Sequence, residues 1–129
     1  LLDHLDAFNN ASLPGIDRNI DNISKVVIDA LNMCGISPSA YPDELSGGMK
    51  KRLAFARALV ANPGFIILDE PFNNLDRVSR MELWELFFKL FTERGIPSLI
   101  ITHYPEELAG WNVSYYELNN GSLRSISGF

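Results

Sequence analysis

Apolar side chains recur at helical spacing in three segments of the chain. Along Asp21–Met33 they fall three or four residues apart, and Gly35 follows as a helix stop. A second helix is predicted over Gly48–Ala61 and a third over Arg77–Arg94, which Gly95 ends. The third segment is apolar on more than one face, so we expect it to lie between a sheet and a second layer.

Short apolar runs and one alternating segment predict strands. Phe65–Leu68 follows a turn and is typical of a buried strand, and Ser98–Thr102 predicts another. Polar and apolar positions alternate along Val113–Leu118 and again along Ser122–Ile126. The intervening Asn119-Asn120-Gly121 is a turn sequence, so the end of the chain predicts a β-hairpin.

Composition places the chain among globular domains. It has 129 residues, 47% of them hydrophobic and 21% charged, which indicates neither disorder nor a membrane span. The net charge of −5 argues against a nucleic-acid-binding surface. Cys34 is the only cysteine, so a disulfide within the chain is excluded, and its apolar surroundings predict an inert core residue.

The segment Leu45–Arg52 carries the most informative local pattern. Ser46, Gly47 and Gly48 stand directly before a predicted helix. Serine caps a helix well and glycine lets an anion approach the backbone, so the amides of the first turn form a ready phosphate site. A bound polyphosphate would also offset the cost of the cations at Lys50–Arg52, which oppose the helix dipole. A plain helix cap stays open as the alternative.

Carboxylates and a histidine follow the two predicted strands. Asp69 and Glu70 end the first strand, where two adjacent carboxylates are costly unless something uses them. Because successive strand side chains point to opposite faces, Asp69 can hold magnesium while Glu70 polarises an attacking water. His103 follows the second strand, at the edge where α/β proteins bind ligands. A solvated strand end and a structural histidine remain the alternatives.

Four segments, taken in order, resemble the nucleotide-binding subunit of ABC transporters. They are Leu45–Arg52 (the signature motif), Phe65–Glu70 (the Walker B strand), Asn73–Asp76 (the D-loop) and Ile100–His103 (the switch histidine). The resemblance runs from about Ala40 onward and implies an α/β fold, a partial P-loop NTPase of the ABC type. It implies a helical subdomain with the signature over about 1–63, and over about 64–129 the C-terminal part of the core sheet, ending in a β-hairpin.

The resemblance implies an ATPase whose site is shared between two subunits. ATP would lie on the phosphate loop of one subunit and under Ser46, Gly47 and Gly48 of the other. The resemblance assigns Asp69 to magnesium through water, Glu70 to the base, His103 to the γ-phosphate and Asp76 to coupling of the two sites. It implies a second ATP-binding subunit and transmembrane permease subunits as partners, no nucleic acid, and a cytoplasmic position on the inner face of the membrane.

Some residues look most like one branch of that family, and others depart from its pattern. Tyr41–Glu44 and Pro71-Phe72 look most like subunits that import nitrate, sulfonate or taurine. Met49 stands where many members have glutamine, Tyr104 where aspartate is usual, and Asn73-Asn74 where smaller residues are frequent. The changes at Met49 and Tyr104 fall at tolerant places and Asp76 of the D-loop is in place, so the resemblance still implies an active enzyme.

The phosphate-binding loop of the family is absent from these residues. No Gly-x-x-x-x-Gly-Lys-Ser/Thr occurs, the chain has no glutamine for a Q-loop, and it opens at Leu1. We therefore expect the C-terminal portion of a longer subunit, inactive by itself. Two alternatives remain open: a non-catalytic fragment or degenerate subunit that offers its signature to a partner, and an ABC-type ATPase without a membrane partner.

Overall fold

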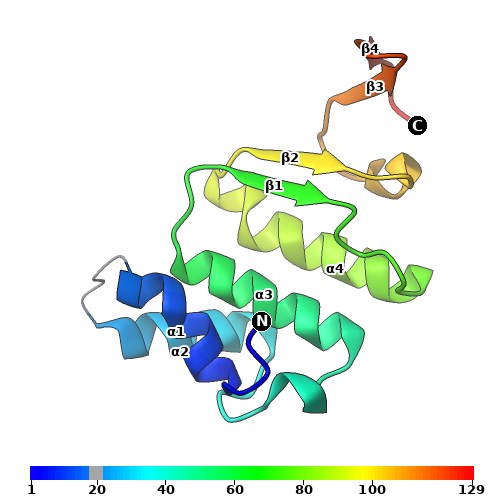
Figure 1. The fold of residues 1–129 in the computed structure, drawn as a ribbon. Helices are drawn as coiled ribbons and strands as arrows, with labels where there is room; N and C mark the ends of the chain where they lie inside the picture. Colours follow the sequence, from blue (N-terminus) through cyan, green and yellow to red (C-terminus); the bar gives the residue numbers. More distant parts are fainter. Residues whose placement is uncertain (18–21) are drawn as a thin grey trace.

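In the part of the chain that the structure describes, helices pack beneath a small parallel sheet, and a β-hairpin forms a second sheet (Figure 1). The computed structural model describes residues 1–17 and 22–129. The α-helices are α1 (Ala7–Asp17), α2 (Ile23–Cys34), α3 (Gly47–Val60) and α4 (Arg77–Leu90), and the 3₁₀ helices are η1 (Pro42–Glu44), η2 (Thr92–Arg94) and η3 (Pro105–Leu108). Helix α3 packs against α1 and α2 and also contacts α4, and α4 lies between α3 and the first sheet.

The strands form one parallel and one antiparallel pair. Strand β1 (Ile66–Asp69) pairs in parallel with β2 (Ser98–Ile101), and the register places Asp69 opposite Ile101. Strand β3 (Tyr115–Asn119) pairs with β4 (Ser122–Ile126) as the predicted hairpin. Its turn residues Asn120 and Gly121 have φ of 49° and 78°, the positive values that a two-residue hairpin turn requires.

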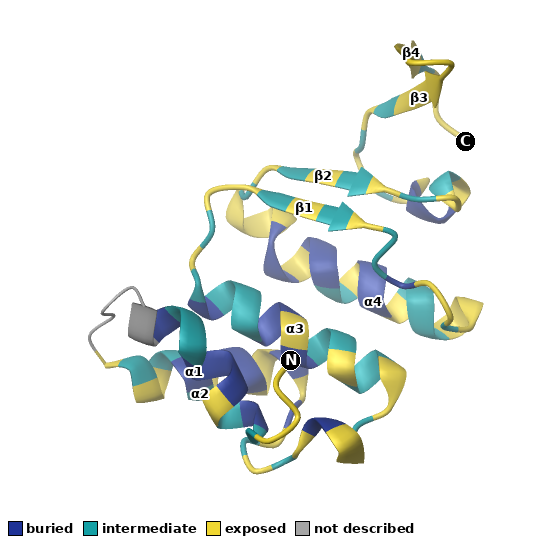
Figure 2. Cartoon of the chain, viewed as in Figure 1, coloured by how far each residue is buried: buried dark blue, intermediate teal, exposed yellow. Residues whose placement is uncertain are grey.

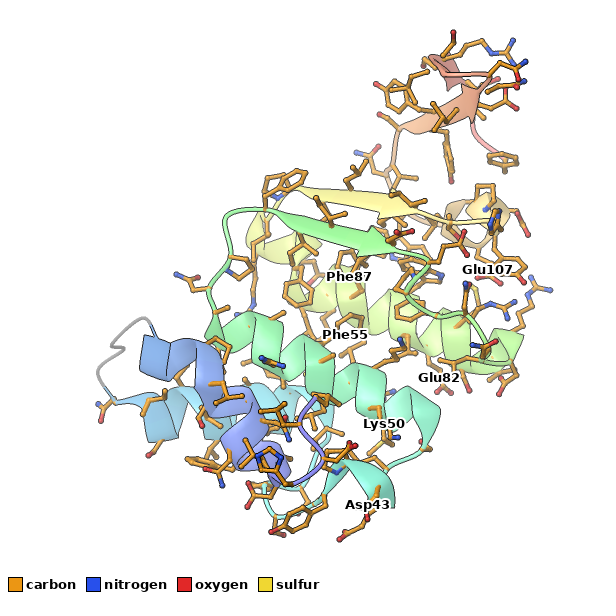
Figure 3. All side chains as sticks on the ribbon, viewed as in Figure 1. Asp43, Lys50, Phe55, Glu82, Phe87 and Glu107 are labelled. Atoms are coloured by element: carbon orange, nitrogen blue, oxygen red, sulfur yellow. The ribbon has the colours of Figure 1, made fainter. Side chains whose placement is uncertain are left out.

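Aromatic side chains of α4 form the centre of the core, as the sequence predicted. Figure 3 shows Phe87 of α4 facing Phe55 of α3, and their ring centroids lie 5.9 Å apart. Trp84 is buried on the same helix and meets Phe72 edge to face, with centroids 4.5 Å apart. Phe72 lies in the turn that follows β1, so this contact fixes that turn against α4.

The helix boundaries differ from the sequence prediction at several places. Helix α2 begins at Ile23, and the predicted start at Asp21 lies outside the described residues. Helix α4 ends at Leu90, and the segment up to Arg94 turns into the 3₁₀ helix η2. Helix α1 was not predicted. Across residues 1–17 and 22–129, no helix is long and apolar enough to cross a membrane.

Only one face of the first sheet is covered, so β1 is half-buried where the sequence predicted a buried strand. Ile66 and Leu68 pack on the core, whereas Ile67 is 61% exposed. Leu99 and Ile101 of β2 are 50% and 46% exposed on the same side, by the alternation of the register. Figure 2 shows this alternation along both strands, with the buried residues of α4 below them. Parallel sheets are normally covered on both faces, so this open apolar face is unusual.

The thiol of Cys34 is enclosed at the end of α2, as predicted. Burial raises its pKa to about 12, so it stays protonated at pH 8. We expect Ellman's reagent to label the native chain at least ~100-fold more slowly than the chain in guanidinium, because labelling must wait for an opening of the structure. Equal rates in the two solvents would contradict the enclosed position.

Candidate functional site

Glu70 and His103 meet at the carboxyl ends of the two parallel strands. The Nε2 atom of His103 lies 2.6 Å from Oε1 of Glu70. The amide of Glu70 donates to the carbonyl of Ile101 over 2.8 Å, which carries the strand ladder one residue further and brings the two ends together. The His103 side chain is 81% exposed and that of Glu70 only 21%. The pair therefore places a carboxylate at the edge of the core with an exposed imidazole on it.

The backbone of Glu70 adopts a conformation that glutamate rarely takes. Its φ is +47°, in the left-handed region, which costs a residue with a Cβ about 1–2 kcal/mol. The surrounding structure holds it there, because Phe72 is anchored in the core two residues later. Backbone strain of this kind gathers at functional sites. The strained residue is the one that the sequence assigns to the chemistry.

Asp69 lies on the other side of the strand from Leu68, as the alternation predicted. Its residue is exposed, on the open face that also carries Ile67. Magnesium prefers oxygen ligands and keeps several waters, so one exposed carboxylate fits binding through water. Among the described residues, no group of three or more acidic, histidine or cysteine side chains could hold a metal by itself.

The serine and glycines of the signature begin α3, at a separate place in the chain. Ser46 is the N-cap, and its Oγ accepts a hydrogen bond of 3.2 Å from the Met49 amide. A Cβ at Gly47 would lie 3.0 Å from Leu75, whereas a Cβ at Gly48 would meet nothing within 4 Å. A side chain at 47 would therefore need Leu75 to shift slightly, whereas position 48 is open.

Asp76 caps α4, a role that the sequence analysis did not assign. Its carboxylate accepts from the Ser79 amide at 2.8 Å and from the Ser79 hydroxyl at 3.0 Å. These hydrogen bonds hold the pKa of Asp76 below its ordinary value, and the bond from the Ser79 amide has the larger effect. The exposed Asp76 thus begins α4 whatever else it contacts.

The sequence analysis did not predict a buried ion pair that lies beside the site. Arg80 of α4 donates to Glu107 of η3, with NH2 2.7 Å from Oε1, and its NH1 donates to the Leu75 carbonyl at 2.7 Å. Trp84 Nε1 donates to the same carboxylate at 3.3 Å. Figure 3 shows Glu107 beside the end of the first sheet. Arg80 and Glu107 are 27 residues apart, and neither local sequence predicts that the two residues pair.

A hollow of about 480 Å³ lies elsewhere, on α4 and Trp111. Its lining includes Val78, Met81 and Glu82 and none of the sequence-predicted site residues. The structure thus brings Glu70 and His103 together. Asp69 and Ser46 are exposed and lie on β1 and at the start of α3, apart from each other in the chain.

Comparisons with known proteins agree on one family. The sequence profile of the ABC transporter family matches residues 1–73. The ABC transporter ATP-binding protein YtrE of Bacillus subtilis is 38% identical over 128 residues, which are 96% of this chain and 55% of the relative. The lipoprotein-releasing system ATP-binding protein LolD of Bordetella avium is 37% identical, over 95% of this chain and 55% of its own length. The nitrate import ATP-binding protein NrtC of Synechococcus elongatus is 34% identical over 85% of this chain and 17% of its own.

Solved structures show the same relationship. The dimeric structure of MJ0796, a bacterial ABC transporter cassette, superposes with a TM-score of 0.77 at 28% identity, over all of this chain and 60% of that one. A second structure of MJ0796, in a post-hydrolysis state bound to ADP and Pi, gives a TM-score of 0.76. The chain therefore spans a little over half the length of the first curated relative and of these structures.

Proposed function

The chain belongs to the ABC transporter family, and on that premise we propose that it carries one part of the ATP-hydrolysing site of a transporter. The contact between Glu70 and His103 carries the proposal. In it, Glu70 takes the proton from the water that attacks the γ-phosphate, and His103 orients that carboxylate and meets the phosphate. Asp69 would hold magnesium through water, and the ion would neutralise charge on the phosphates.

The open surroundings of Gly48 support a second part of the proposal, that the signature turn binds nucleotide held by a partner subunit. A Cβ at 48 would meet nothing within 4 Å in this chain, so the space beside the Gly48 backbone is open to an approaching ligand. The amides at the start of α3 would then face the phosphates. The Oγ of Ser46 lies at the same helix start, so its hydroxyl would also contact the phosphates. Asp76 would lie at the same interface and couple the two sites.

The uncovered face of the first sheet supports the need for a further segment. Burying the exposed halves of Ile67, Leu99 and Ile101 would stabilise the protein by about 1 kcal/mol for each side chain. The matched part covers 55% of the YtrE and LolD relatives, so about 45% of each lies outside it. We assign the cover to the segment that carries the phosphate loop, because Asp69 faces that side and no phosphate-loop motif occurs in these 129 residues.

The partners in this proposal are a second ATP-binding subunit and transmembrane permease subunits, with the protein on the inner face of the membrane. We place the signature subdomain over about 1–63 and the strand-bearing part over about 64–129, in keeping with the packing of α1, α2 and α3 on one another. The names of the relatives include nitrate import and lipoprotein release. The proposal therefore stops at a transporter ATPase, and the importer type suggested by Tyr41–Glu44 is one branch of it.

The test compares the 129-residue chain with a fusion protein. In the fusion protein, the residues that precede the aligned region of the Bacillus subtilis relative are joined to Leu1. We expect calorimetry to detect no micromolar binding of Mg-ATP to the chain alone, because it offers only the few amides of the Ser46 turn. The fusion protein should bind Mg-ATP and hydrolyse it.

Each result decides between the proposal and its alternatives. Micromolar binding by the chain alone would contradict a site completed from outside. A fusion protein that folds, as judged by circular dichroism, but binds no ATP would favour the non-catalytic binding module. Binding without hydrolysis would contradict the catalytic roles proposed for Glu70 and His103.

A further inference from the structure

Arg80 connects three segments that the sequence leaves apart. Its guanidinium reaches Glu107 through Nε and NH2, and NH1 reaches the carbonyl of Leu75. Its Cζ also lies 4.4 Å from the centre of the Tyr104 ring. One side chain thus holds the D-loop, helix α4 and the segment that directly follows His103. We call Arg80, Glu107, Trp84 and the Leu75 carbonyl the Arg80 cluster.

The Arg80 cluster is enclosed and well satisfied. The side chain of Glu107 is only 3% exposed and that of Arg80 15%. Both oxygens of Glu107 accept hydrogen bonds from Arg80, and Trp84 donates to one of them. A buried carboxylate with this many donors is fixed in position, because any displacement leaves a charge without partners. Lysine could not replace Arg80, since it lacks the planar fork that reaches two acceptors in different directions.

Two residues that contact Arg80, Leu75 and Tyr104, lie beside residues of the proposed site. Leu75 lies against the signature, since a Cβ at Gly47 would be 3.0 Å from its side chain. Tyr104 follows His103, whose imidazole contacts Glu70. Arg80 therefore links Leu75, which lies beside the start of α3, to Tyr104, the residue that follows His103.

We propose that Arg80 is a positioning residue that holds the D-loop (residues 73–76) and the switch segment (residues 102–108) as one unit. Because the two segments form one unit, a shift at the start of α3 changes the contact between His103 and Glu70. A change in that contact likewise shifts the start of α3. Arg80 touches no substrate in this role and acts through Leu75, Glu107 and Tyr104. The expected effect on ATP turnover rests on the proposed function. The existence of the structural unit rests only on the contacts of Arg80.

Hydrogen exchange on the 129-residue chain tests the unit without nucleotide. The variants are Arg80→Lys and Glu107→Gln, with Arg77→Lys as the matched control, since Arg77 is exposed on the same helix. We expect both test variants to raise amide exchange in the D-loop and the switch segment together, about 10-fold or more, because local opening then costs less. Exchange in α2 should stay unchanged, and the control should match the parent chain.

Two outcomes of this experiment would overturn the proposal. One is faster exchange in the switch segment with the D-loop unaltered, which would make Arg80 a local anchor of η3. The other is an equal rise in every helix, which would make the ion pair a contributor to global stability alone.

A second measurement uses turnover by the fusion protein. Arg80→Lys should lower kcat about 10-fold and leave KM for ATP within about twofold, because the interaction matters after binding. In a His103→Ala background the same change should have no further effect on kcat, since residues that act as a unit are not additive. Equal loss in both backgrounds would refute positioning through His103. A fusion protein without any ATPase activity would instead count against the proposed function, and the exchange experiment would still decide the unit.

Discussion

Glu70→Gln in the fusion protein is expected to lower the rate of ATP hydrolysis at least ~100-fold, the usual loss when a positioned base is removed. Glutamine keeps the size of the side chain, and its amide oxygen can still lie against His103 Nε2. The backbone strain at φ +47° is also the same for both residues. The change therefore removes the proton acceptor and leaves the surrounding structure in place.

Binding of Mg-ATP should persist in this variant, and it should accumulate as an ATP-bound dimer. Steady-state phosphate release and calorimetry measure the two effects. Glu85→Gln is the control, because it removes the same charge from an exposed position on α4. Turnover within about threefold of the parent protein would show that Glu70 is not the base.

Ser46→Arg is expected to abolish ATP-driven dimerisation of the fusion protein while binding of ATP to the monomer persists. Ser46 lies at the start of α3, where an arginine would occupy the space in which the partner's nucleotide is proposed to lie. The nucleotide of the same subunit rests on its own phosphate loop and is not disturbed. The effect is large because the signature supplies the only contacts that the proposal gives to the partner's phosphates.

Size-exclusion chromatography with Mg-ATP, on a Glu70→Gln background, measures this effect. Ser125→Arg on the β-hairpin is the control, because it adds the same charge to another exposed serine. Ser46→Ala separates the two roles of the residue, since loss of the helix cap alone should cost about 1 kcal/mol of stability. If dimers form despite Ser46→Arg, the signature is no more than a capped helix.

The sequence predicted the elements whose signals are local. Gly35 has φ +70° and ends α2, and the Asn120-Gly121 turn closes the hairpin, because each needs a conformation that few residues adopt. The strand-end acids were also recognisable, since two adjacent carboxylates after an apolar run are rare without a use. The contact between Glu70 and His103 then followed from parallel pairing, which brings the ends of β1 and β2 to one edge.

The remaining features depend on contacts that are distant in the sequence. Helix α1 contains Pro14, which argues against a helix when only local preferences are considered. Packing on α2 and α3 outweighs that preference. The burial of Arg80 and Glu107 was unpredictable for another reason: both residue types are normally exposed, and only their partners make burial possible. The open face of the first sheet likewise reflects what lies over it, which local sequence does not encode.

The left-handed backbone at Glu70 has a bearing on the history of this gene. A glycine at this position would relieve about 1 kcal/mol of strain, so mutation without selection for catalysis would drift toward residues that tolerate the conformation. An inactive descendant would therefore become more stable as it lost this carboxylate. The glutamate at this position therefore carries a local cost in stability, which its proposed role as the base would account for.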